Sequence, residues 1–192
     1  MKRLLLVAAA GVITVVGATV GGLIAPAAAG DGPLPPEVRE VRAAVARYHS
    51  LNQAERDGYT VEGEPCVASP AGTMGIHAVN PALLADDAID VRRPELLLYV
   101  PKSNGKLEFV GVEYWKIALA NTDAGPRPWF GEDEPPRGFF TPAPAVVGQT
   151  FDGPMEGHTP TMPWHYDLHV WLWADNPSGL YAPFNPALAC PA

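Results

Sequence analysis

Four of the five histidines in this 192-residue chain fall in two short segments. In the C-terminal segment, residues 162–173 alternate polar and apolar side chains, as a β-strand does when its side chains point to opposite faces. One of these faces carries His165, Asp167, His169, Trp171 and Trp173, and His158 lies just upstream. Alternate residues of a strand are about 6–7 Å apart, so neighbouring side chains can converge on one small ion. This spacing predicts a metal or small-ligand site.

Two further residues qualify as ligands from elsewhere in the chain. His77 ends a glycine-containing segment, residues 72–77, where glycine permits close approach of the backbone. Glu113 stands in the middle of an apolar strand pattern, where a carboxylate is costly to bury unless it is paired or coordinated. The predicted metal shell is His77, His165 and His169 with either Glu113 or Asp167 as the carboxylate, and His158 lies at its rim.

Imidazole and carboxylate ligands suit zinc, iron, manganese or copper, and ligand type alone does not choose among them. In an enzyme, such an ion would activate water or dioxygen at an open position, with Glu113 or Asp167 as the base. Two other interpretations stay open. In the first, the chain is a non-catalytic binding or cell-envelope interaction module. In the second, His165, Asp167 and His169 form a polar ladder that only sets strand register. The helical His-Glu-x-x-His pattern of zinc proteases does not occur.

The N-terminal residues have the pattern of a secretory signal peptide. Lys2 and Arg3 precede an apolar run, and alanines at positions 27–29 supply a small-residue cleavage pattern. Residues 1–29 are therefore expected to be removed, although the apolar run is also long enough for an uncleaved anchor. The predicted location is extracellular or in the cell envelope, without stable membrane insertion after cleavage. The net charge of −8 argues against nucleic acid as a partner.

The chain has two cysteines, Cys66 and Cys190. In an exported protein an even pair predicts a disulfide bond, here between a segment near the N-terminal helix and the C-terminal tail. A metal site built on these cysteines is the rival interpretation.

The remaining pattern predicts the elements that position these side chains. Residues 30–36 form a Pro/Gly linker, and residues 37–192 form one secreted domain. Its helix runs from the proline pair at 35–36 to about Asp57. Strands are expected at residues 59–67, 73–79, 96–100 and 107–119, and a long loop at 121–149 is interpreted as a lid. The predicted fold is α+β: an N-terminal helix packed on an antiparallel sheet or small open barrel, with one disulfide.

Several motifs resemble those of an uncharacterised family of secreted actinobacterial proteins. The resemblance lies in Met-Gly-Ile-His at 74–77, Pro-Glu-Leu-Leu-Leu-Tyr at 94–99, Val-Gly-Val-Glu-Tyr at 110–114 and His-Tyr-Asp-Leu-His-Val-Trp at 165–171. It covers nearly all of the expected mature chain. It implies secretion and the motif boundaries, and it implies no reaction mechanism.

Overall fold

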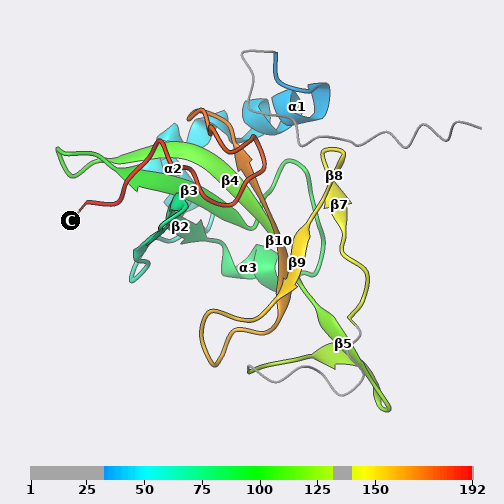
Figure 1. Cartoon of the computed structure of the whole chain (residues 1–192). Helices are drawn as coiled ribbons and strands as arrows, with labels where there is room; N and C mark the ends of the chain where they lie inside the picture. Colours follow the sequence, from blue (N-terminus) through cyan, green and yellow to red (C-terminus); the bar gives the residue numbers. More distant parts are fainter. Residues whose placement is uncertain (1–32, 132–139, 192) are drawn as a thin grey trace, which may run out of the picture.

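The centre of the fold is a six-stranded antiparallel sheet that curls into a half-barrel (Figure 1). The computed structural model describes residues 33–131 and 140–191. The strand order is β1-β2-β3-β4-β10-β9. These strands are β1 (Cys66–Ser69), β2 (Gly72–Val79), β3 (Leu96–Pro101), β4 (Leu107–Ile117), β9 (Asp152–Met155) and β10 (His165–Trp171). The prediction of an antiparallel sheet is confirmed.

The N-terminal helical region is interrupted, in contrast to the single helix predicted to Asp57. It consists of α1 (Pro36–Val45), a 3-10 turn (Ala46–His49) and α2 (Leu51–Arg56). Ser50 has an extended backbone, with ψ at 107°, and this breaks the helical path. A third helix, α3 (Pro81–Ala85), begins where the side chain of Asn80 accepts hydrogen bonds from two backbone N–H groups of its first turn.

The sheet separates two sets of buried side chains. On β10, Tyr166, Leu168 and Val170 lie in a large apolar cluster that also contains residues of α1, β3 and β4. His165, Asp167 and His169 lie on the opposite face, and they too are buried, with at most 3% of each residue exposed. The alternation expected from sequence is therefore real, but both faces are shielded from water.

The alternation ends at Trp171. The backbone N–H groups of Leu172 and Trp173 both donate to the carbonyl of Val110, so two consecutive residues share one partner. Trp173 consequently packs against Phe109 in the large apolar cluster, with ring centroids 4.9 Å apart. The expectation that Trp173 shares the histidine face is wrong, because this local bulge reverses its direction.

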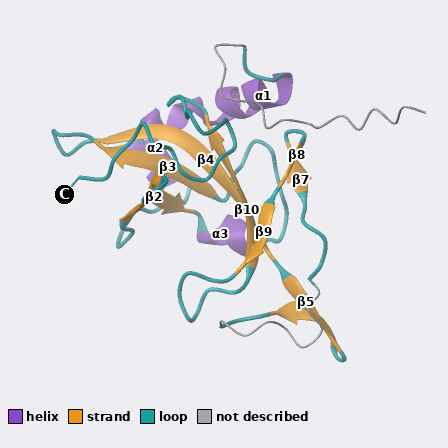
Figure 2. Cartoon of the chain, viewed as in Figure 1, coloured by secondary structure: helices purple, strands orange, loops and turns teal. Residues whose placement is uncertain are grey.

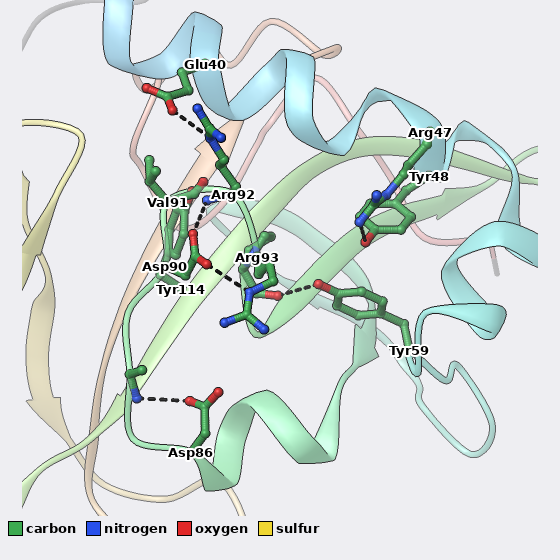
Figure 3. A network of polar contacts seen from close by, with 12 residues as sticks. Glu40, Arg47, Tyr48, Tyr59, Asp86, Asp90, Val91, Arg92, Arg93 and Tyr114 are labelled. Atoms are coloured by element: carbon green, nitrogen blue, oxygen red, sulfur yellow. Dashed lines mark hydrogen bonds and ion pairs between the residues drawn. The ribbon is translucent and has the colours of Figure 1, made fainter.

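Polar contacts tie α1 to the segment before β3 (Figure 3). Arg92 forms an ion pair with Glu40 at 2.8 Å, and Arg93 forms one with Asp90 at the same distance. Tyr59 donates a hydrogen bond to the carbonyl of Pro94 at 2.6 Å. The Arg92–Glu40 pair joins α1 to the segment before β3, whereas the Arg93–Asp90 pair lies within that segment.

Glu95 is a buried carboxyl group with a structural role. It is 1% exposed, and its Oε2 accepts a hydrogen bond from the backbone N–H of Trp115 at 3.0 Å, just where β3 begins. Burial raises the pKa of Glu95 to about 7. The folded protein therefore keeps a proton that the unfolded chain releases near its ordinary pKa of 4.5.

This difference predicts a pH-dependent stability. The contribution of neutral Glu95 is fully present below about pH 4.5 and is lost as the pH rises through 7. In Glu95→Gln the amide oxygen still accepts from Trp115 and cannot ionise. Between pH 4.5 and 7.5, the wild-type protein is expected to lose roughly 2–3 kcal/mol of unfolding free energy relative to the variant. Urea unfolding of both proteins checks this, and parallel pH curves would contradict it.

Two smaller hairpins overlap the two ends of the segment predicted as a long loop, so that prediction is wrong at the residues they occupy. They are β5 (Leu119–Thr122) with β6 (Gly125–Pro128), and β7 (Ala145–Val146) with β8 (Gln149–Thr150). Figure 2 shows β5 pointing away from the central sheet. Gly125 has φ at 98° and closes the first turn, a conformation that glycine adopts without strain. The middle of the segment, 132–139, lies outside the described residues, and the lid interpretation stays a prediction.

The strand predicted at 59–67 is wrong except at Cys66 and Val67, which begin β1. Thr60 makes only an isolated bridge to Val79, and Gly63 has a positive φ of 79° that turns the chain before β1. The expected signal peptide, 1–29, lies outside the described residues. Within the described part of the chain, every helix is too short or too polar to cross a membrane.

Cys66 and Cys190 form the predicted disulfide, with their Cα atoms 5.7 Å apart. The bond joins β1 to the C-terminal tail, which is also held by paired backbone hydrogen bonds between Thr73 and Asn185. A link across 124 residues restricts the unfolded chain strongly.

Replacing both cysteines with alanine is therefore expected to lower the unfolding free energy by about 4 kcal/mol, because the unfolded chain regains its conformational entropy. Denaturant unfolding of the double variant measures the loss, and reduced wild-type protein should show the same one. A double variant as stable as the oxidised protein would contradict the expectation.

Candidate metal centre

Three side chains from three strands meet on the face opposite the large apolar cluster: His77 of β2, Glu113 of β4 and His169 of β10. Glu113 and His169 are direct cross-strand partners, and such partners point to the same face. His77 reaches them across β3, where it pairs with Leu98 while Glu113 pairs with Leu96. Sheet register, rather than closeness in sequence, therefore creates the group.

The potential ligand atoms have the separations expected around one ion. Oε2 of Glu113 lies 3.1 Å from Nε2 of His77 and 3.5 Å from Nε2 of His169. All the potential ligand atoms lie within 4.8 Å of one another. Ligands about 2.0–2.2 Å from a shared transition-metal ion stand roughly 3–3.5 Å apart. The two contacts to Glu113 thus match a common ion without rearrangement of the backbone.

The charges of the three groups also suit metal binding. Burial acts to raise the pKa of Glu113, but the neighbouring His169 and His77 outweigh it and lower that pKa to about 2. Burial lowers the pKa of His169 to about 4, so this imidazole is neutral at pH 7. Burial acts to lower the pKa of His77 too, but the combined interactions with Glu113 outweigh it, so the pKa of His77 is raised. A metal ion would therefore find a carboxylate at Glu113 and a neutral imidazole at His169.

Four buried side-chain atoms in the described part of the chain have no hydrogen-bond partner, and all four lie here: Glu113 Oε2, Trp115 Nε1, Asp167 Oδ1 and His169 Nε2. His77 is close enough to Glu113 for an ion pair but is not aligned for a hydrogen bond. Native proteins rarely leave buried polar atoms unpaired, since each costs about 1–3 kcal/mol. Their concentration in one place leaves buried polar atoms that a bound ion or ligand could satisfy.

The other predicted ligands lie beside this group rather than in it. Among the described residues, the cluster of potential metal ligands comprises His77, Glu113 and His169 alone. His165 stacks on Trp115 with ring centroids 5.5 Å apart, and its Nδ1 lies 3.2 Å from the carbonyl of Pro163. His158 contacts the edge of His165, with ring centroids 5.3 Å apart. Burial lowers the pKa of His165, so it contributes a neutral ring to this neighbouring stack.

Asp167 adjoins the group. Its Oδ1 is 4.0 Å from Nδ1 of His169, which is too long for a hydrogen bond. Burial, together with Glu113 and Asp152, raises the pKa of Asp167 to about 8. Sequence reasoning missed Trp115 as a site residue. Its position two residues after Glu113, on the same strand face, was the signal available.

Comparisons with models of protein families, with curated proteins and with solved structures found no match to this chain. The resemblance in motifs described above therefore stays a prediction.

Proposed function

We propose that this protein is exported and binds one transition-metal ion through His77, Glu113 and His169. The observation that carries the proposal is the pair of unpartnered buried atoms, Glu113 Oε2 and His169 Nε2, which face one another at 3.5 Å. A metal ion accepts electron pairs from both atoms at once. Export is supported by the N-terminal pattern of residues 1–29 and by the disulfide bond.

Two imidazoles and one carboxylate are a ligand set used by catalytic zinc and by non-haem iron(II). Three protein ligands leave at least one position for water or substrate, where an ion can polarise a bound oxygen. If the protein is an enzyme, Asp167 is the better candidate for proton transfer, because a Glu113 that binds the metal with a pKa near 2 accepts protons poorly. With a pKa of about 8, Asp167 holds a proton at pH 7 and suits a general acid. The reaction itself stays open.

The test is the metal content of the protein purified from an exported preparation without a histidine tag. Elemental analysis is expected to find about one equivalent of a transition metal, or a metal-free sample should take up one equivalent of zinc, iron, manganese or copper. Absence of both bound metal and uptake would reject the proposal.

The second candidate is a non-catalytic binding or cell-envelope interaction module whose His/carboxylate ladder is structural. The observation that favours it is the 3.1 Å approach of His77 to Glu113, which an ion pair explains without a metal ion. In that case His77→Gln lowers the unfolding free energy equally with and without added metal. A metal centre predicts instead that added metal stabilises the wild-type protein and leaves the variant unchanged.

A further inference from the structure

Two of the unpaired atoms lie beside the proposed metal ligands rather than among them. Trp115 and Asp167 are cross-strand partners on β4 and β10, two residues along the strands from Glu113 and His169. Trp115 Nε1 and Asp167 Oδ1 are buried and unpartnered. Adjacent pairs on one face of a sheet are about 7 Å apart, which is roughly the distance from a metal ion through a small chelating ligand to a hydrogen-bonding group.

The Trp115 side chain is held in place. Its backbone N–H is bound by Glu95 at 3.0 Å, and its ring is stacked on His165 at an interplanar angle of 24°. An indole N–H can only donate a hydrogen bond, so a ligand must offer it an acceptor. Trp164 and Trp171 show the usual outcome, since each donates its indole N–H to a backbone carbonyl. The indole N–H of Trp115 is therefore available to donate a hydrogen bond to a ligand.

The charge of the bound ion and its protein ligands limits the chemical class of a further ligand. The direct ligands, Glu113 and two neutral imidazoles, compensate only one of the two positive charges of a divalent ion, and a buried ion is costly when its charge is unmatched. A monoanionic ligand supplies the missing negative charge. Asp167 Oδ1 has no donor, and a hydroxyl group on the ligand would provide one.

We infer that the metal centre binds a small hydroxycarboxylate, whose carboxylate accepts a hydrogen bond from Trp115 and whose hydroxyl contacts Asp167. Both oxygen groups would chelate the ion at positions the protein leaves open. The ligand is small because Glu113, Asp167 and His169 are each at most 5% exposed. Access is from the side of His77, whose side chain is 13% exposed. This inference rests on the proposed metal site.

The experiment uses cobalt(II) as the metal probe and glycolate as the ligand probe, followed by the visible absorption of the bound cobalt. Cobalt is titrated first. Glycolate is then expected to bind at least 10-fold more tightly than acetate, which lacks the hydroxyl, or ethylene glycol, which lacks the charge. Trp115→Phe keeps the stacked ring and removes the N–H, so glycolate affinity should fall about 10-fold while cobalt affinity stays within 2-fold.

Trp164→Phe is the matched control, because it removes an indole N–H that already has a backbone partner; its glycolate affinity should equal that of the wild-type protein. Equal binding of all three probes to the wild-type protein would overturn the inference without need of any variant. An unchanged glycolate affinity in Trp115→Phe would overturn it as well. Failure of cobalt to bind would instead reject the metal site, and the ligand with it.

Discussion

The Glu113→Gln variant is expected to bind a divalent transition metal at least about 100-fold more weakly than the wild-type protein. Glu113 Oε2 is the atom that approaches both His77 and His169. Glutamine has nearly the same shape but no charge, and its amide is a poor metal ligand. Loss of an outer-shell partner typically costs about 10- to 100-fold in metal affinity, so loss of a direct ligand should cost more. Competition titration with a chromogenic chelator measures the change.

Glu95→Gln provides the control for this variant. Both substitutions replace a buried carboxyl of the central sheet, but Glu95 binds a backbone N–H and lies outside the group of potential ligands. The control should therefore retain wild-type metal affinity. Equal affinity in Glu113→Gln and the wild-type protein would show that the ion, if bound, is held elsewhere.

Gly111→Ala is expected to lower the unfolding free energy by about 3 kcal/mol. Gly111 pairs with Trp171 across β4 and β10, and a Cβ atom there would lie 2.5 Å from the carbonyl oxygen of Val170. That neighbour is backbone, so it cannot rotate away, and the two strands must separate. The same two strands carry Glu113 and His169. Urea unfolding monitored by tryptophan fluorescence measures the loss.

Gly105→Ala distinguishes crowding from backbone strain. Gly105 lies in the hairpin turn between β3 and β4 with φ at 75°, and a Cβ atom there has nothing within 4 Å. This substitution should cost only about 1–2 kcal/mol, the usual cost of a left-handed conformation for a residue with a side chain. If Gly111→Ala lowers the unfolding free energy less than Gly105→Ala does, the close contact of β4 with β10 does not require glycine at position 111.

Parts of the site were predictable from the sequence because they depend on local periodicity. Period-two alternation places Asp167 and His169 on one face, and the apolar surroundings of Glu113 mark that carboxylate as unusual. Which histidines converge is a matter of register between distant strands, which periodicity does not contain. His165 shares the face of His169, yet it pairs with Ile117 rather than Glu113 and lies about 13 Å farther along the strand.

The errors in the fold have equally local causes. Helical periodicity continues past Ser50, but the extended backbone of that one residue interrupts the helix. The proline-rich region after Thr122 was predicted as loop, although prolines are tolerated in a two-stranded ribbon, as β6 shows. Trp173 was misplaced because a bulge at the end of a strand has no strong signature in composition.

His77 and His169 stand 92 positions apart in the chain, and Glu113 lies on a third strand between them. The three ligands therefore come together only after β2, β4 and β10 have paired in their native order. Contacts between residues so far apart in the chain form late in folding. If the protein is exported unfolded, as its N-terminal pattern predicts, the bound metal would be set by the ions present where folding is completed. The bound ion would then reflect the metal ions available in that compartment. The ions available in the cytoplasm would have little influence on which one is bound.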